Sequence, residues 1–166
     1  PVAADNVTIV SGATVTLNQG ATFSINVLNI QIGATLNVSC TVLAPGFTIS
    51  NASTIAGLLD FIPTGSTTTN TGNKTFYNVT VTSTGVIKDN KSISLSSTVG
   101  STLTNNGTIS TATLGTGSYS MNNYGTMTIT GGFNSGSASG NFNNNAGATF
   151  NYTGGAGCIF KNYGTL

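Results

Sequence analysis

The chain has 166 residues, a formal net charge of +1 and only 4% charged residues, with no histidine. This length fits one domain of ordinary size. Nucleic-acid binders neutralise phosphates with clustered lysine and arginine, so the scarcity of basic residues excludes a nucleic-acid partner. Disordered chains combine low hydrophobicity with high charge, whereas apolar residues alternate with polar ones along this sequence. We therefore expect a single ordered β domain over residues 1–166.

The sequence carries no sign of a membrane span. No stretch approaches the roughly 18 apolar residues that a membrane-spanning helix needs. No positively charged segment precedes an apolar core at the start, so a signal peptide has been removed or lies outside this sequence. Asparagine, threonine, serine and glycine must provide the solubility that charge usually provides, and they offer little repulsion against self-association.

The first part of the chain, residues 6–42, has the pattern of short strands joined by tight turns. β-Branched residues and the alternation of apolar and polar side chains predict strands at residues 6–10, 14–17, 22–28 and 35–38. Turns are predicted at residues 11–12, 19–20 and 32–33. Each of these turns contains glycine, which accepts the positive φ of a tight corner without steric cost.

Residues 43–75 interrupt this rhythm, and we expect an irregular stretch here. Residues 55–62 are the most apolar segment of the chain, whereas residues 64–74 form a low-complexity loop. Gly57 and Pro63 leave little room for a helix, so a strand is favoured over a short helix in the apolar segment.

The strand pattern resumes after residue 75, and residues 105–166 form the clearest repeat. Strands are predicted at residues 76–81, 85–87 and 92–95. In the repeat, each rung opens with asparagines before a glycine, at residues 105–107, 122–125, 143–147 and 162–164. Asparagine tolerates the left-handed backbone conformation, so these positions are predicted to be corners. We also expect stacked asparagines to join their amides in hydrogen-bonded ladders.

One phrase recurs from near the start of the chain to its end. It consists of glycine, an optional alanine, threonine, and then alternating apolar and polar residues; its copies begin at Gly12, Gly20, Gly33, Gly107, Gly125, Gly147 and Gly164. A repeat of about 20 residues is the signature of stacked coils, each of which buries its apolar face only against its neighbours. The sequence therefore predicts an all-β parallel β-helix, or β-solenoid, with coils of about 20 residues. A β-sandwich is the alternative, but a sandwich does not require one repeated period.

Threonine follows glycine or glycine-alanine in every copy of the phrase, and alternation turns it away from the core. This predicted outward row comprises Thr14, Thr22, Thr35, Thr108, Thr126, Thr149 and Thr165. An aligned threonine array resembles the flat face of ice-binding β-solenoids, which makes ice binding an alternative function. The next outward position varies among threonine, serine and asparagine, and threonine also stabilises sheet faces. A strand-stabilising role is therefore the favoured interpretation of the row.

The sequence resembles repetitive surface proteins of prokaryotes. The resemblance rests on residues 6–39, on residues 74–81 (KTFYNVTV) and on the rungs NNGTI and NNYGTM. The sequence is similar to the large adhesin-like and gliding-associated proteins that bacteria export by the type IX route, and to repeats of other surface filaments, including archaeal ones. The resemblance implies a right-handed parallel β-helix, export, and a surface or filament role, and it brings no catalytic residues. The C-terminal sorting domain of a complete type IX substrate is absent from the sequence, so we expect a segment or subunit of a larger structure.

Enzymatic activity is not expected. Glycoside hydrolysis needs two carboxylates roughly 5 to 10 Å apart, but Asp5, Asp60 and Asp89 lie in three separate regions. Lys88 and Asp89 are adjacent, so a strand would turn them to opposite faces. Asp60 is interpreted as a solvated loop carboxylate. We therefore predict no catalytic residue, no metal site and no cofactor.

The remaining candidate residues are cysteines, glycosylation sequons and tyrosines. Cys40 and Cys158 would be five or six coils apart, roughly 25 Å, so they are expected to be separate half-buried thiols rather than a disulfide within the chain. A bond to a neighbouring molecule is the alternative. Candidate glycosylation sites of the form Asn-x-Ser/Thr are Asn6, Asn37, Asn51, Asn73, Asn78, Asn90, Asn106 and Asn151. Exposed tyrosines at Tyr77, Tyr124 and Tyr163 make a carbohydrate-binding module a second alternative function.

These features together predict an extracellular structural or adhesive protein that forms part of a surface fibre. A solenoid must cover its terminal coils, because otherwise their unpaired backbone groups and apolar interior are exposed. Neither end of this sequence has the pattern of a cap. We therefore expect end-to-end assembly with copies of the chain or with flanking repeats, in which the edge strand at Val7, Thr8 and Ile9 continues the sheet that Thr165 and Leu166 begin. Surface glycans are a further candidate partner.

Overall fold

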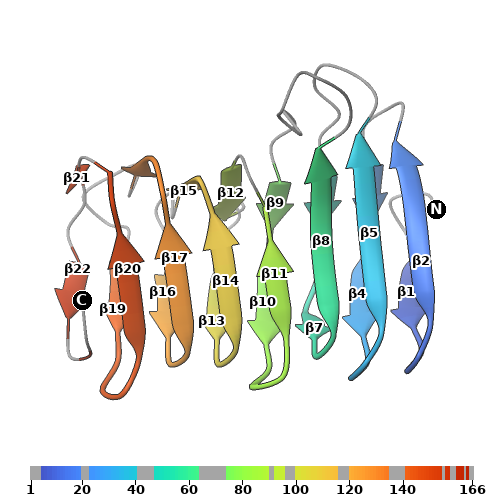
Figure 1. The fold of residues 1–166 in the computed structure, drawn as a ribbon, viewed down its shortest axis with the longest axis horizontal. Coiled ribbons are helices and arrows are strands. Elements are labelled where there is room, and N and C mark those ends of the chain that lie inside the picture. Colours follow the sequence, from blue (N-terminus) through green and yellow to red (C-terminus); the bar gives the residue numbers. More distant parts are fainter. Residues whose placement is uncertain are drawn as a thin grey trace.

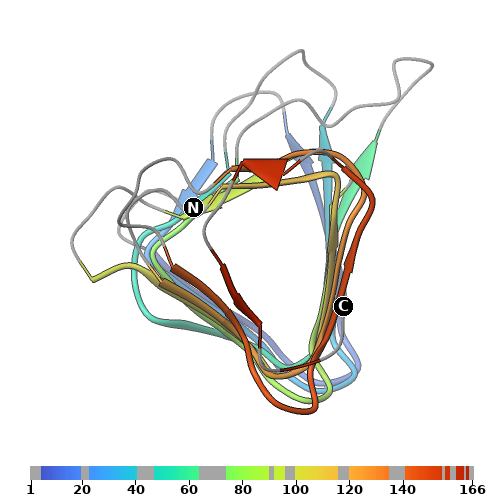
Figure 2. The same ribbon diagram turned by 90° about the vertical axis from the view of Figure 1, so that its left-hand side faces the viewer.

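The chain folds into a parallel β-solenoid. The computed structural model describes residues 5–19, 23–40, 47–63, 74–89, 92–95, 100–115, 120–134, 141–154, 156–157, 160–162 and 164. These residues form strands and short corners without a helix, and they build three parallel sheets. Figure 1 shows one coil stacked beside the next, and Figure 2 shows the three-sided cross-section. The predicted solenoid is confirmed, and the β-sandwich, whose sheets are antiparallel, is excluded.

The three sheets contain eight, seven and seven strands. Sheet A contains β1 (Asn6–Ile9), β4 (Val27–Ile30), β7 (Ser53–Ile55), β10 (Asn78–Val81), β13 (Thr102–Asn105), β16 (Ser120–Asn123), β19 (Asn141–Asn144) and β22 (Phe160–Asn162). Sheet B contains β2 (Thr14–Gln19), β5 (Thr35–Cys40), β8 (Leu58–Pro63), β11 (Val86–Lys88), β14 (Thr108–Thr111), β17 (Thr126–Ile129) and β20 (Thr149–Tyr152). Sheet C contains β3 (Phe23–Ile25), β6 (Phe47–Ile49), β9 (Lys74–Phe76), β12 (Ser92–Leu95), β15 (Thr113–Gly115), β18 (Phe133–Asn134) and β21 (Ala156–Gly157).

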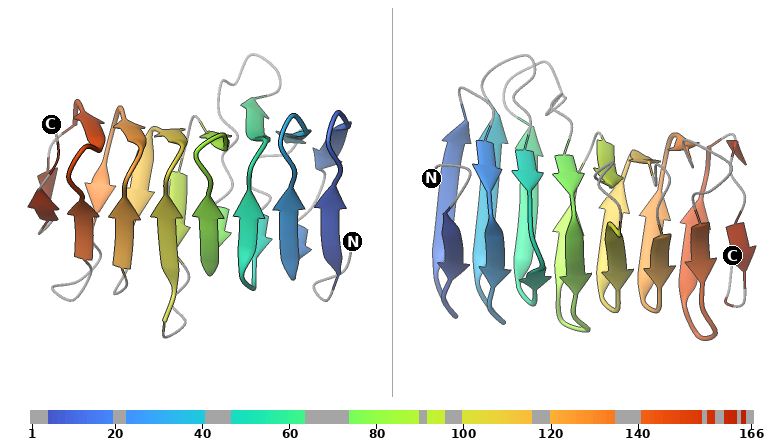
Figure 3. Two further views of the ribbon diagram at one scale, coloured as in Figure 1. Left: turned by 90° about the horizontal axis from the view of Figure 1, so that it is seen from below. Right: turned by 180° about the vertical axis from the view of Figure 1, so that it is seen from behind.

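The chain visits sheets A, B and C in turn and then begins the next coil, and the coils keep one stacking direction along the rod (Figure 3). Coil length varies. Asn105 stacks on Asn123, 18 residues later, whereas Leu58 stacks on Val86, which is 28 residues later. The longer coils accommodate the extra residues between strands, so the register of the sheets is kept.

Apolar side chains fill the interior because they alternate with polar ones along each strand. In sheet B the stacked inward residues Leu36, Leu59, Ile87, Ile109, Met127 and Phe150 are each at most 2% exposed. Aromatic rings fill the later coils, where Phe142 lies 4.7 Å from Phe150 and 5.2 Å from Phe133 between ring centroids. The inward positions predicted in the asparagine-rich repeat are therefore confirmed at Ile109, Met127 and Phe150.

Sheet A passes into sheet B through corners of two lengths. Four residues make the corner at 10–13, 31–34, 82–85 and 145–148, and two residues make it at 56–57, 106–107 and 124–125. The two-residue corners need glycine because the backbone of the preceding coil lies against them. A Cβ atom at Gly107 would lie 2.2 Å from the carbonyl oxygen of Gly85, and one at Gly125 would lie 2.1 Å from that of Gly107.

Three of the four-residue corners use glycine differently, whereas Gly85 of the corner at 82–85 also lies against the backbone of the preceding coil. Gly12 and Gly33 have φ angles of 77° and 74°, as predicted for turns at these positions. No described residue other than glycine has a positive φ. The prediction that corner asparagines adopt the left-handed conformation is therefore wrong.

The asparagines of the repeat instead form a ladder inside the rod. Asn105 donates from Nδ2 to Oδ1 of Asn123 (2.7 Å) and to the Thr126 carbonyl oxygen (3.0 Å). Asn123 repeats the arrangement with Asn144 (2.8 Å) and the Thr149 carbonyl oxygen (3.0 Å). All three asparagine side chains are fully buried. The predicted ladder is confirmed, and it satisfies polar groups that would otherwise be costly to bury.

Two predicted strands join segments that the structure separates. Residues 22–28 contain β3, a bend at Asn26 and the start of β4, and residues 76–81 span the end of β9, a bend at Tyr77 and all of β10. In both places the spacing of the buried residues shifts from two to three across the corner, from Ile25 to Leu28 and from Phe76 to Val79. This shift in the alternation marks the change of sheet, and the predicted strands ran through it.

The stretch predicted to be irregular, residues 43–75, belongs to the solenoid wherever the structure describes it. Strands β6, β7 and β8 lie within this stretch and stack in register on neighbouring coils. The strand predicted in the apolar segment is confirmed as β8. Lys74, which was assigned to the loop, begins β9; residues 43–46 and 64–73 lie outside the described residues.

Candidate functional site

The outer face of sheet B carries two rows of side chains that run along the rod. The first row consists of Thr14, Thr35, Leu58, Val86, Thr108, Thr126 and Thr149. The predicted threonines of β2, β5, β14, β17 and β20 therefore do stack, but two aliphatic residues interrupt their row. Thr22 precedes β3, which belongs to sheet C, so its copy of the phrase was wrongly grouped with the others. Thr22 itself and Thr165 lie outside the described residues.

The second row carries the charges of this face. It consists of Thr16, Asn37, Asp60, Lys88, Ser110, Thr128 and Asn151. Asp60 and Lys88 are register neighbours on β8 and β11, directly beside the aliphatic pair Leu58 and Val86. Asp60 is half-buried in a strand, which corrects its assignment to a loop, and Lys88 is exposed. Among the described residues, neither charged side chain has an ion-pair partner.

A notch of about 250 Å³ opens at the edge of this face, beside the corner that joins sheets A and B. It forms because the two-residue corner before β8 lies between the four-residue corners before β5 and β11. Its lining includes Ile32, Ala56, Leu58, Thr84 and Val86. Aliphatic side chains thus meet solvent at this edge, in the middle of a row that is otherwise threonine.

The exposed large hydrophobic side chains of the described residues all lie on the corners between sheets A and B. Val10 is 57% exposed, Ile32 is 62% exposed and Tyr124 is 53% exposed. Scattered single hydrophobic residues on a surface are ordinary. Their confinement to one edge of a three-sided rod makes this edge the part of the surface that is best suited to a contact.

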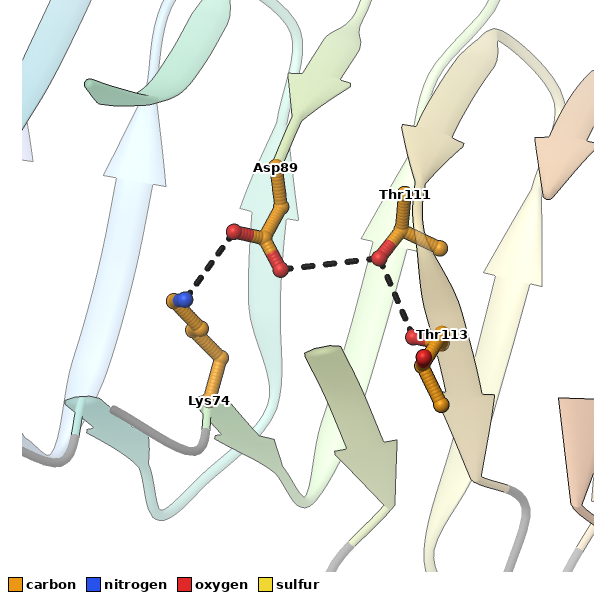
Figure 4. Close-up of polar contacts among 4 residues, drawn as sticks. All are labelled: Lys74, Asp89, Thr111 and Thr113. Atoms are coloured by element: carbon orange, nitrogen blue, oxygen red, sulfur yellow. Dashed lines mark hydrogen bonds and ion pairs between the residues drawn. The ribbon is translucent and has the colours of Figure 1, made fainter. Parts of the chain in front are cut away.

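The interior contains a buried ion pair that the sequence analysis missed (Figure 4). Lys74 Nζ lies 2.9 Å from a carboxylate oxygen of Asp89, and the two side chains are 1% and 0% exposed. The other carboxylate oxygen lies 3.5 Å from the Thr111 hydroxyl, which is also 3.0 Å from the Thr113 carbonyl oxygen. The ammonium lies 5.3 Å from the ring centroid of Phe61, within the range of a cation–π contact.

This ion pair joins two sheets of the rod. Lys74 begins β9 in sheet C, and Asp89 follows β11 in sheet B, where its backbone N–H donates to the Ser110 carbonyl oxygen (2.8 Å). Lys88 and Asp89 face opposite sides, as predicted. Because solvent does not reach the pair, its role is to hold the coil rather than to meet a substrate.

The carboxylates are not brought together. Asp5 is exposed near the start of the chain, Asp60 lies on the outer face of sheet B, and Asp89 is inside. Among the described residues, no three histidine, cysteine, aspartate or glutamate side chains are grouped as a metal site. No helix in this part of the chain is suited to crossing a membrane.

The sequons differ in accessibility. Asn6, Asn51, Asn106 and Asn151 are exposed, Asn37 and Asn78 are half-buried, and Asn73 and Asn90 lie outside the described residues. Some exposed amides are engaged in an outer ladder, in which Asn26 donates to Oδ1 of Asn6 (2.9 Å) and Asn51 donates to Oδ1 of Asn26 (2.8 Å). Attachment of a sugar to the Asn51 amide nitrogen would compete with this bond.

The tyrosines and cysteines do not form a joint site in the described residues. Tyr77 is half-buried between β9 and β10, whereas Tyr124 lies on the corner between β16 and β17. Tyr163, Cys158 and the side chain of Cys40 lie outside the described part of the chain. Tyr77 and Tyr124 thus lie on different corners of the rod.

The predicted assembly edge at Val7, Thr8 and Ile9 lies in β1, the first strand of sheet A. The strand at the other end of sheet A is β22, and Thr165 and Leu166 lie outside the described residues. If copies continued sheet A end to end, β1 would pair with β22 rather than with residues 165–166. The predicted pairing with Thr165 and Leu166 stays a prediction, because these two residues are not described.

Comparisons of the chain with protein-family models, with curated proteins and with solved structures find no match.

Proposed function

We propose that this chain is a structural segment of an extracellular surface fibre, in which the solenoid stacks end to end on further coils of the same kind. The observation that carries the proposal is the geometry of sheet A. Its strands are parallel throughout, and among the described strands β1 and β22 each have a neighbour on one side only, so their two outer edges are complementary. A head-to-tail contact between two different edges does not close on itself and generates an open filament.

The backbone of β1 supports this proposal in detail. The carbonyl oxygens of Asp5 and Ile9 accept bonds from Asn26 and Gln31 of the next coil. Successive residues of a strand direct their backbone groups to alternate sides, so the backbone groups of Thr8 point away from β4. They provide the hydrogen bonds with which a further coil would be added.

The composition supports an exposed, load-bearing role. With 4% charged residues, the chain offers little electrostatic repulsion between stacked copies. Side-chain ladders such as Asn105, Asn123 and Asn144 add bonds along the rod axis to those of the backbone. An adhesin-like protein exported by the type IX route is the more specific form of the proposal, and it rests on the sequence resemblance alone.

Proline at position 8 tests the proposal. Thr8→Pro removes an N–H that points to the free edge and blocks this edge with its ring, while the bonds from β1 to β4 are kept. We expect electron microscopy of the native chain to show filaments, and the T8P chain to remain as short rods with an unchanged circular dichroism spectrum. Thr8→Val is the matched control, because it keeps the backbone donor and should still form filaments.

Two outcomes would count against end-to-end stacking. One is a native chain that stays monomeric at millimolar concentration in sedimentation experiments. The other is a T8P chain that forms filaments as readily as the T8V chain. The proposed absence of catalysis is tested separately by incubating the chain with polysaccharides, where turnover that Asp60→Asn abolishes would overturn it.

A further inference from the structure

The outer face of sheet B is complementary to itself. If a second copy is turned about a two-fold axis that runs parallel to the strands, between β8 and β11, then β8 of one copy faces β11 of the other. Each outward row then faces the same row of the second copy. Asp60 meets Lys88 of the second copy, and Lys88 meets its Asp60, so that two ion pairs form between groups that have no ion-pair partner among the described residues of the single chain.

We propose that sheet B is a pairing face, at which two copies of this chain pack face to face with their rods antiparallel. The interface is isologous, because the same patch is used on both copies. The proposal does not depend on end-to-end stacking, which uses the edges of sheet A rather than the face of sheet B.

The aliphatic residues of the face agree with the same axis. Leu58 and Val86 are the apolar members of the first row and lie on the two strands that flank the axis. The two-fold places Leu58 of each copy against Val86 of the other. An apolar centre bordered by charged and polar groups is the usual anatomy of an interface.

The corner lengths agree with the axis independently. Along the rod, the corners before β2, β5, β8, β11, β14 and β17 have four, four, two, four, two and two residues. The two-fold places the corner before β8 against that before β11, the corner before β5 against that before β14, and the corner before β2 against that before β17. In each of the three pairings a long corner meets a short one, and Figure 1 shows the long corners extending further at the lower edge of the rod.

The exposed hydrophobic residues provide a third agreement. Val10 lies on the corner before β2, and Tyr124 lies on the corner before β17. These two corners face each other in the pair, twice by symmetry. Ile32, the third exposed residue, borders the notch beside Leu58 and Val86.

The size of the face predicts a reversible pair. Six facing strands spaced by ~4.8 Å, with about four residues of ~3.3 Å each, give a face of roughly 30 by 13 Å, or about 400 Å² per copy. Stable interfaces usually bury about 800 Å² per partner. A single pair should therefore form only at high concentration, whereas rods that also stack end to end would repeat the contact and hold more firmly.

Charge reversal tests the pairing. In the T8P background, which blocks end-to-end growth, sedimentation equilibrium should show a concentration-dependent dimer and no larger species, because a two-fold contact closes on itself. Asp60→Lys and Lys88→Asp should each weaken this dimer about tenfold or more, because like charges then face each other. An equimolar mixture of the D60K and K88D chains should pair again, and so should the D60K/K88D double variant.

Thr80→Lys is the control, because it adds a positive charge on the outer face of sheet A, where Thr80 is exposed. It should leave the dimer unchanged. The proposal is overturned if the wild-type face gives no dimer up to millimolar concentration, or if T80K weakens the dimer as much as D60K does. It is also overturned if the mixed chains pair no better than the separate ones, because only contacts between copies can be restored by mixing.

Discussion

Removal of one partner of the buried Lys74–Asp89 pair should be among the most destabilising single substitutions in this rod. The two groups are 2.9 Å apart and enclosed, so at an effective dielectric constant of about 20 their Coulomb attraction is about 6 kcal/mol. The cost of removing both charges from water offsets much of this attraction. Lys74→Met leaves the Asp89 carboxylate buried without its cation, and Asp89→Asn leaves the ammonium without its anion. Each should lower the free energy of unfolding by about 3–5 kcal/mol.

The double variant makes it possible to measure the interaction between Lys74 and Asp89 separately from their contacts with other residues. K74M/D89N contains no buried charge, and its amide can still approach the Thr111 hydroxyl, so it should cost no more than about 1 kcal/mol. The coupling energy from the double-mutant cycle should therefore be about 5 kcal/mol or more. Urea unfolding followed by circular dichroism provides the four free energies. Lys88→Met is the control, since Lys88 is adjacent in sequence but exposed, and its effect should stay within about 0.5 kcal/mol.

A different result would refute this reasoning. If K74M costs no more than K88M, the two charges are not buried together in solution. If the double variant is as unstable as the sum of the two single variants, the groups act independently, and the pair does not hold sheets B and C together.

Three further predictions concern the corners, the ladder and the core. Gly107→Ala should lower the free energy of unfolding by about 3 kcal/mol in urea titrations, because the added Cβ meets the carbonyl oxygen of Gly85. Gly12→Ala should lower it by about 1 kcal/mol, because Gly12 has open space around it but a positive φ. Equal losses in the two variants would contradict the close approach at Gly107. Asn123→Ala should lower the free energy of unfolding by about 2–4 kcal/mol, because it leaves the buried groups of the ladder without hydrogen-bond partners. Asn122→Ala, at a half-buried position, should lower it by less than about 1 kcal/mol. A small loss in Asn123→Ala would show that the ladder contributes little to stability. Phe150→Asp should prevent folding because it places a charge in the core, whereas Thr128→Asp, on the outer face, should leave the thermal melt nearly unchanged. Similar melts for the two variants would show that the inward and outward positions are assigned wrongly.

The sequence predicts which side chains of a strand point inward better than it predicts which strands lie side by side. The alternation around Ile109, Met127 and Phe150 identifies the inward side because a strand turns successive side chains to opposite faces. At Asn26 and Tyr77, where the chain changes sheet, the spacing of the buried residues shifts from two to three. Period-2 alternation therefore predicts burial within a strand, and its shifts mark corners that the predicted strands at residues 22–28 and 76–81 missed.

Stacking partners could not be derived from the repeat because the coil length varies between 18 and 28 residues. The position of Leu58 in the threonine row depends on the long coil that follows it. The pairing of Lys74 with Asp89 depends on the meeting of two different sheets, which no local pattern records. Lys74 was placed in a loop because the low-complexity residues before it contain no strand signal.

The departures from the repeat are the most informative features for function. In a regular solenoid, equivalent residues of successive coils stack in lines, such as lines of threonine or asparagine. Each coil then presents the same surface, so no position along the rod can be distinguished from the next. Leu58, Asp60, Val86 and Lys88 break two such lines on neighbouring strands, where the corner length also changes. A contact that depends on these residues has a fixed position on the rod, whereas a contact with the threonine rows could slide by one coil. Copies that pair through this patch would therefore be aligned at one register, which a uniform row could not specify.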